Sequence, residues 1–185
     1  MNATVDVTTI RIETPRLILR PWRETDLQDF YEYASVDGVG ELAGWRHHGS
    51  VEESRTILNS FIRHKKTFAL VLKETGKVIG SLGLEELDPD PVEGTSYGRE
   101  IGYVLSKNHW GCGLMTEAVQ AVIRYCFETL DFDYLTCGHF VGNHRSQRVI
   151  EKCGFTYTGT SDYQTRYGTV ERSRNYILFN PHKER

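Results

Sequence analysis

Hydrophobic residues recur along this chain with two spacings, and these spacings predict strands mixed with helices. Apolar positions three and four residues apart, typical of amphipathic helices, follow Thr25, Ser50 and Gly113 and recur near Arg145–Lys152. Short apolar runs, typical of strands, lie at Leu17–Arg20, Phe68–Leu72, Val78–Leu84, Glu100–Ser106, Tyr134–Val141, Phe155–Thr160 and Ser173–Phe179. This mixed order predicts an α+β fold in which helices cover both faces of a twisted sheet.

Two capping boxes mark the starts of the first two helices. Thr25–Gln28 and Ser50–Glu53 each place a hydroxyl three residues before Gln or Glu, so that side chains pair with the first backbone N–H groups. Glycines interrupt the segment between these helices, Asp37–Gly49, and we expect it to be a loop that shapes a pocket. The helices are expected to bury Leu27, Phe30, Tyr31 and Ala34 in the first, and Ile57, Leu58, Phe61 and Ile62 in the second.

Length and composition indicate one globular domain over residues 1–185, with residues 1–10 expected to be mobile. Charged residues make up 25% of the chain and the net charge is −3, which does not favour a nucleic-acid-binding surface. Neither a membrane span nor a signal-peptide core is evident, so we expect a cytoplasmic protein. The cysteines lack a C-x-x-C pair, and we expect free thiols, with neither a disulfide nor a metal site, at Cys112, Cys126, Cys137 and Cys153.

A glycine-rich turn, Trp110–Ala118, joins the predicted strand at Glu100–Ser106 to the helix that follows. Such a turn presents unpaired backbone N–H groups at a helix N-terminus, where anions bind. A P-loop is excluded because no glycine-rich run ends in Lys followed by Ser or Thr. The dinucleotide fingerprint is excluded because Thr116 stands where its third glycine is needed. The remaining candidate ligand is the pyrophosphate of coenzyme A, held by Gly111, Cys112, Gly113, Leu114, Met115 and Thr116; the alternative is a tight connection with no ligand.

Three motifs resemble the GCN5-related N-acetyltransferases (GNAT). Trp110–Met115 occupies the frame of the family's Arg/Gln-x-x-Gly-x-Gly/Ala signature, with Trp110 and Met115 as departures. Both departures are familiar in the branch of ribosomal-protein N-terminal acetyltransferases, and we expect a structural role for Trp110. Further matches to that branch run from Thr14 to Arg20 and from Asn143 to Phe155. The resemblance covers roughly Thr14–Asn180, nearly the whole chain.

The resemblance implies a mostly antiparallel sheet in which two parallel strands splay apart and admit acetyl-CoA. The acceptor would be a primary amine, either a protein N-terminus or a small molecule. Backbone groups at Tyr103, Val104 and Leu105 would pair with the pantetheine arm, and one near Val104 or Leu105 would polarise the acetyl carbonyl. Asn143 would bond the pantetheine amides and Ser146 would meet the departing thiolate. The alternatives are buried strand residues at 103–105 and ordinary helix capping by Asn143 and Ser146.

Glu100 is the candidate base. Strand alternation places Glu100, Gly102 and Val104 on one face. An amine with a pKa near 10 is mostly protonated at neutral pH, so a base must expose its lone pair, directly or through water. The alternative is that Glu100 pairs with Arg99 or another cation.

Several other residues carry rival interpretations. Cys112, at a helix N-terminus, is a candidate acetyl carrier, although the family transfers directly. Cys137 and His139 are two apart on a strand and suit either metal binding or packing. His47 and His48 suit either acceptor contact or solvation. The acidic loop Asp88–Glu93, if it borders the pocket, favours a cationic acceptor.

The sequence therefore predicts an acetyl-CoA-dependent N-acetyltransferase. One alternative is a non-catalytic coenzyme-A-binding module on the same fold, and another is a structural domain whose glycines serve only the fold. A homodimer is compatible with the sequence, but no interface is indicated.

Overall fold

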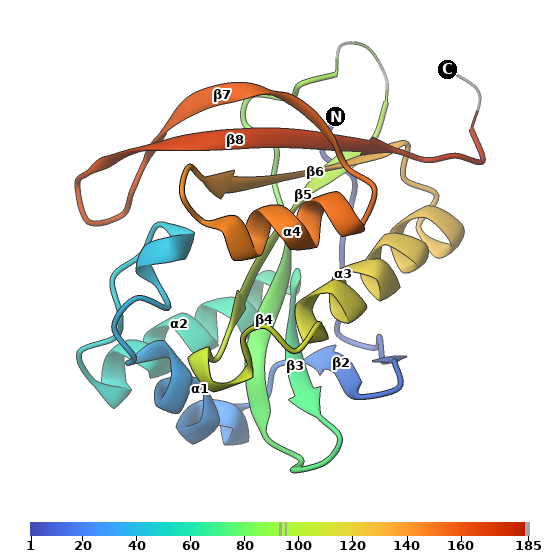
Figure 1. Cartoon of the computed structure of the whole chain (residues 1–185). Helices are drawn as coiled ribbons and strands as arrows, with labels where there is room; N and C mark the ends of the chain where they lie inside the picture. Colours follow the sequence, from blue (N-terminus) through green and yellow to red (C-terminus); the bar gives the residue numbers. More distant parts are fainter. Residues whose placement is uncertain (93, 95, 184–185) are drawn as a thin grey trace.

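The computed structural model describes residues 1–92, 94 and 96–183, and its eight strands form one sheet (Figure 1). The strands lie in the order β1-β2-β3-β4-β5-β6-β8-β7, and neighbours are antiparallel except for the parallel pair β5 and β6. The predicted mixed fold, with a mostly antiparallel sheet and one parallel pair, is confirmed. The strand bounds are β1 Ile12–Glu13, β2 Leu17–Pro21, β3 Thr67–Leu72, β4 Val78–Glu85, β5 Gly98–Leu105, β6 Tyr134–Phe140, β7 Thr156–Gln164 and β8 Val170–Phe179.

Helices cover both faces of this sheet. Helices α1 (Leu27–Ala34) and α2 (Val51–His64) pack on one face, and α3 (Leu114–Arg124) and α4 (His144–Lys152) pack on the other (Figure 1). A π-helical turn, Tyr125–Thr129, continues α3. No helix in the described part of the chain is long and apolar enough to cross a membrane.

Strand β3 shows how the two faces divide the core. Phe68 and Leu70 belong to the apolar cluster under α3 and α4, whereas Ala69 and Val71 belong to the cluster under α1 and α2. Every residue of β3 is buried because both of its faces are covered. This double coverage explains why the strand reads as a continuous apolar run rather than as an alternating one.

The two predicted capping boxes differ in outcome. At α2 the prediction is confirmed in part: the Glu53 N–H donates to Ser50 Oγ at 3.2 Å, while the Glu53 carboxylate accepts from Gly49 instead of Ser50. The Thr25–Gln28 box is wrong. A 3₁₀ turn, Glu24–Asp26, precedes α1, and its buried Asp26 carboxylate accepts from the Arg23 N–H and the Arg20 guanidinium, each at 2.8 Å.

The buried face of α1 also differs from the prediction. Tyr33, not Tyr31, is buried, with 2% of its surface exposed, and its ring packs 5.5 Å from that of Phe30. Tyr33 packs in the apolar cluster that includes Leu58 of α2 and Ala69 of β3, contacts that the periodicity of α1 alone does not reveal.

The N-terminal segment is packed rather than mobile, contrary to the expectation for residues 1–10. Asn2 forms a parallel bridge with Gly98, and its side chain bonds both backbone groups of Leu87. Ala3 and Val7 are buried in the core under α3 and α4. The apolar residues at every second position of this short segment are the signal that identifies it as extended and half-buried.

Strands β7 and β8 extend further than the predicted Phe155–Thr160 and Ser173–Phe179. They form a long hairpin whose outer strand, β7, is exposed along most of its length (Figure 1). The residues of this extension are mostly polar and exposed, so no apolar pattern indicates it.

Candidate active site

Strands β5 and β6 separate partway along their length. They pair only from Gly98 to Ile101 on β5 and from Tyr134 to Cys137 on β6. Beyond that point β5 continues to pair with β4, and β6 with β8, so the edges that face each other have no strand between them. This is the predicted splayed pair.

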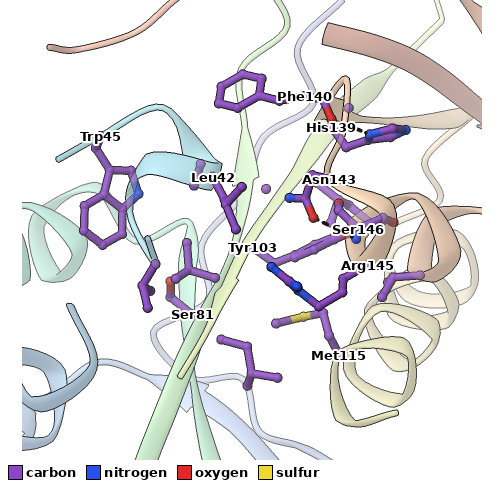
Figure 2. Close-up of a pocket in the computed structure, with 18 of the residues that line it drawn as sticks. Leu42, Trp45, Ser81, Tyr103, Met115, His139, Phe140, Asn143, Arg145 and Ser146 are labelled. Carbon is purple, nitrogen blue, oxygen red and sulfur yellow. Dashed lines mark hydrogen bonds between the residues drawn. The ribbon is translucent and has the colours of Figure 1, made fainter. Parts of the chain in front are cut away.

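A cavity of about 770 Å³ lies at this opening. Figure 2 shows Leu42 and Trp45 on one side of β5, with Asn143 and Ser146 on the other. Most of the predicted site residues come together here. Those lining the cavity are Glu100, Tyr103, Val104, Leu105, Gly111, Gly113, Leu114, Met115, Thr116, Asn143 and Ser146.

Glu100 stands at the closed end of the opening, on the last part of β5 that pairs with β6. Burial raises its pKa, and the negative charge of Glu85 raises it further. Glu85 lies directly opposite on β4, where its carboxylate pairs with Lys66 Nζ at 2.7 Å. Its carboxylate folds back over Gly83, and a Cβ at that position would collide with it.

The alternative role of Glu100 as the partner of Arg99 has no support among the described residues. Arg99 Nε donates to the Ala3 carbonyl at 2.7 Å, and its Nη1 lies 3.6 Å from Glu86. Adjacent strand residues point to opposite faces, which separates the two side chains. Glu100 is half-buried and lies beside a like charge, and both conditions favour its protonated form.

Ser146 lies across the opening from β5. Its Oγ is 2.7 Å from Tyr103 Oη, and its backbone N–H donates to Asn143 Oδ1 at 3.2 Å. Asn143 therefore caps α4, as the capping alternative expects, while both residues also line the cavity. Burial raises the pKa of Tyr103 well above its ordinary value, which keeps the phenol protonated.

The glycine turn opens directly onto α3. Gly111 and Gly113 have φ of 78° and 77°, in the left-handed region that favours glycine. Gly113 is the N-cap of α3 and brings no capping side chain, so the first-turn amides of Leu114, Met115 and Thr116 have no acceptor within the helix. Both glycines line the cavity, which places these amides at its rim.

Hydrogen bonds to Glu117 in the first turn of α3 connect the Thr14–Arg20 motif to the glycine turn. The Glu117 carboxylate accepts from Thr14 Oγ1 at 2.6 Å, from the Arg16 N–H at 2.8 Å and from Arg16 Nε at 2.7 Å. Arg16 Nη1 also donates to the Cys112 carbonyl at 2.8 Å. The sequence contains both motifs, but it gives no sign that they touch.

Trp110 is fixed at the end of β5. Its Nε1 donates to the Leu105 carbonyl at 2.8 Å, and its ring packs against both apolar clusters. The Arg145 guanidinium lies over the ring, 4.0 Å from its centroid.

The structure gives no support to the acetyl-carrier and metal-binding interpretations of Cys112, Cys137 and His139, although His139 lines the cavity. The Cys112 side chain is exposed and does not line the cavity, which gives the acetyl-carrier interpretation no support. Both ring nitrogens of His139 are occupied: Nδ1 lies 2.9 Å from the Phe140 carbonyl and Nε2 lies 3.1 Å from Tyr176 Oη. Packing therefore accounts for His139 beside the buried Cys137.

The far side of the cavity is built by the loop after α1 and by the β7–β8 turn. The Arg166 N–H donates to the Gly44 carbonyl at 2.8 Å, which joins the two segments. Trp45 and the buried His48 line the cavity, and His48 Nδ1 lies 2.7 Å from Ser54 Oγ. His47 instead lies 2.9 Å from a carboxylate oxygen of Glu41.

The acidic loop Asp88–Glu93 does not border the cavity in its described part, and Glu93 lies outside the described residues. Asp90 binds the N-terminal amine and the Tyr134 hydroxyl instead. The carboxylates that do line the cavity, besides Glu100, are Glu53, Glu85 and Glu86. No local sequence pattern marks these three carboxylates, because only the β4–β5 pairing and the fold of α2 bring them to the opening.

The chain resembles known proteins over most of its length. Residues 16–156 match the family model described as "Acetyltransferase (GNAT) domain". "Uncharacterized N-acetyltransferase p20" of Bacillus licheniformis is 30% identical over 164 residues, which is 85% of this chain and 89% of that protein. "Ribosomal-protein-serine acetyltransferase" of Escherichia coli (strain K12) is 26% identical over 114 residues, 60% of each chain. The crystal structure of an acetyltransferase (GNAT family) from Bacillus anthracis has a TM-score of 0.80 at 21% identity and covers 92% of this chain and 99% of its own, a likeness of fold.

Proposed function

The chain belongs to the GNAT family of N-acetyltransferases, and from this premise we propose that it transfers an acetyl group from acetyl-CoA directly to a primary amine. The observation that carries the proposal is the opening between β5 and β6, with the half-buried carboxyl of Glu100 at its closed end and a glycine turn at its mouth. A thioester arm lying along this opening would bring its acetyl group to the carboxyl.

The residues at the opening fit coenzyme A. The first-turn amides of α3 suit the pyrophosphate, because an anion there meets unpaired N–H groups and the positive end of the helix dipole. Open space adjoins Gly111, where a Cβ would meet nothing within 4 Å. The part of β5 that no longer pairs with β6, from Tyr103 to Leu105, suits the amides of the pantetheine arm, with the Leu105 carbonyl already accepting from Trp110 Nε1. The Asn143 side-chain amide lies across from it.

The reaction needs a neutral amine and a protonated leaving thiol. Glu100 is the proposed base: its raised pKa favours uptake of the ammonium proton, directly or through water. A backbone N–H near Val104 or Leu105 would stabilise the oxygen of the tetrahedral intermediate. Ser146, hydrogen-bonded to Tyr103, would stabilise or protonate the departing thiolate. The coenzyme supplies only the activated acetyl group.

Two acceptor classes remain within this proposal. The name of the Escherichia coli relative, "Ribosomal-protein-serine acetyltransferase", supports a protein acceptor. The carboxylate of Glu85, opposite Glu100, and that of Glu86, elsewhere on the cavity wall, support an acceptor with positive charge, since an ammonium entering the cavity meets negative side chains.

The first test is the thermal unfolding midpoint with and without acetyl-CoA. At about one hundred times the dissociation constant, binding contributes roughly 2.7 kcal/mol, which for a domain of this size corresponds to a rise of about 5–10 °C. No rise at saturating acetyl-CoA would refute both the enzyme and the coenzyme-binding alternative. If the midpoint rises, release of free thiol in the presence of N-terminal peptides and of small amines then measures transfer.

Glu100→Gln distinguishes the enzyme from a non-catalytic coenzyme-binding module. An enzyme should lose kcat while keeping its affinity for the coenzyme. A binding module would release no thiol above the uncatalysed rate with any amine, before or after the substitution.

A further inference from the structure

The aromatic residue before the glycine turn, Trp110, has no charged group that could pair with a phosphate. Trp110 stands where the family signature has Arg or Gln, and its N–H is used by the Leu105 carbonyl. The turn that follows offers backbone amides alone. A pyrophosphate carries negative charge that amides stabilise only in part, so a cation from another element would complete the site.

Arg145 provides such a cation. It lies in the first turn of α4, on the opposite side of the opening from Trp110, and its guanidinium reaches across to lie 4.0 Å from the centre of the indole ring. Figure 2 shows this side chain extending into the cavity beside Tyr103 and Met115. Within the described residues, no carboxylate or carbonyl is recorded as an acceptor for its N–H groups.

The position of the Arg145 guanidinium over the Trp110 ring leaves its N–H donors available to bind a ligand. A guanidinium contacts an aromatic ring with its face, while its N–H donors project from its edge. The ring thus holds the group in place without using its hydrogen bonds. The edge matches the oxygen spacing of a phosphate, with which arginine forms paired hydrogen bonds.

We propose that Arg145 binds the pyrophosphate of coenzyme A and that Trp110 positions it, an inference that rests on the proposed function. Arg145 and Trp110 together bridge the opening through which the coenzyme must pass. Two further cations, Arg148 and Lys152, line the cavity along the same face of α4 but have no recorded contact with Trp110. Arg16 is occupied by Glu117 and the Cys112 carbonyl.

Equilibrium binding of coenzyme A and of pantetheine, which lacks the pyrophosphate, tests this assignment. Arg145→Gln should weaken coenzyme A binding about 10- to 100-fold, the range for loss of hydrogen bonds to a charged group, and leave pantetheine binding unchanged. Arg145→Lys keeps the charge but loses the planar fork. Its affinity for coenzyme A should therefore lie between that of the wild-type protein and that of Arg145→Gln. Arg148→Gln is the matched control, with the same chemistry one turn further along α4, and should change affinity less than Arg145→Gln.

The outcomes separate this inference from the proposed function. If the wild-type protein binds coenzyme A, and Arg145→Gln and Arg145→Lys bind it with the same affinity, the role of Arg145 is overturned. The proposed function would still stand. Equal losses for coenzyme A and pantetheine would also overturn it, because they would indicate a purely structural role. Failure of the wild-type protein to bind coenzyme A would refute the proposed function itself.

Discussion

The phenolic oxygen of Tyr103 lies 2.7 Å from the hydroxyl oxygen of Ser146, and this contact joins the open edge of β5 to the first turn of α4. The two hydroxyls come from opposite sides of the opening. Burial holds the pKa of Tyr103 well above its ordinary value, so the phenol retains its proton at physiological pH. A protonated phenol can restore a proton to Ser146 if the serine gives one up, which makes the pair suited to a departing thiolate.

We predict that Tyr103→Phe and Ser146→Ala each lower kcat on the order of 100-fold, the lower part of the range for general acid catalysis. Because the two groups act as one unit, the double variant should be no slower than the slower single variant. Steady-state thiol release with a fixed amine measures all three. Losses that multiply in the double variant would show that the hydroxyls act independently.

Glu100→Gln should make the protein more stable at neutral pH while lowering kcat by about 100- to 10,000-fold. Burial and the charge of Glu85 raise the pKa of Glu100 in the folded protein. Folding therefore favours its protonated form, and the stability contributed by this group is present at low pH and lost as pH rises through the folded pKa. Gln resembles the protonated form at every pH.

Thermal midpoints measured from acidic to neutral pH check this sign. The advantage of Glu100→Gln should grow as pH rises and vanish below the ordinary pKa of a glutamic acid. An advantage that is constant with pH would assign the effect to packing rather than to the charge.

Removing the neighbouring charge should change the pH dependence of the reaction. In Glu85→Gln the pKa of Glu100 should fall, because a like charge is lost and Lys66 is left without its partner. The acidic limb of the kcat/KM profile should therefore move to lower pH. Glu86→Gln is the matched control, since Glu86 lies near Arg99 rather than opposite Glu100. The same displacement in both variants would argue against a specific Glu85–Glu100 interaction.

Local patterns were sufficient to predict the central elements and most of the residues that meet at the opening. The glycine turn, the α2 cap at Ser50 and the candidate base Glu100 depend on residues close together in the sequence. Contacts between distant segments were not predictable in this way. Arg16 and Glu117 are 101 residues apart, and Tyr103 meets Ser146 only because β6 and α4 return the chain to β5. The buried face of α1 was misassigned for the same reason, since Tyr33 packs in a cluster with residues of α2 and β3 that are distant in the sequence.

The contacts of Glu117 predict that Glu117→Gln lowers the stability of the protein at neutral pH, whereas Glu100→Gln should raise it. Burial raises the pKa of Glu117, but hydrogen bonds from Thr14 and Arg16 outweigh burial and leave it lowered. Folding therefore favours the ionised form, and the stability it contributes is present at neutral pH and lost as pH falls through the folded pKa. Glu117→Gln should lower the free energy of unfolding by about 1–3 kcal/mol at neutral pH, the range for hydrogen bonds to a charged group.

Chemical denaturation at several pH values measures this loss, which should shrink toward acidic pH, where the wild-type carboxyl is also protonated. Because Arg16 connects Glu117 to the Cys112 carbonyl, the variant should also bind coenzyme A more weakly as the glycine turn loses its support. Arg11→Gln is a suitable control: it removes another arginine–glutamate pair of the N-terminal region, one that lies on the exposed surface. An equal loss of stability in that control would mean that the contacts between Thr14, Arg16 and Glu117 do not specifically stabilise the glycine turn.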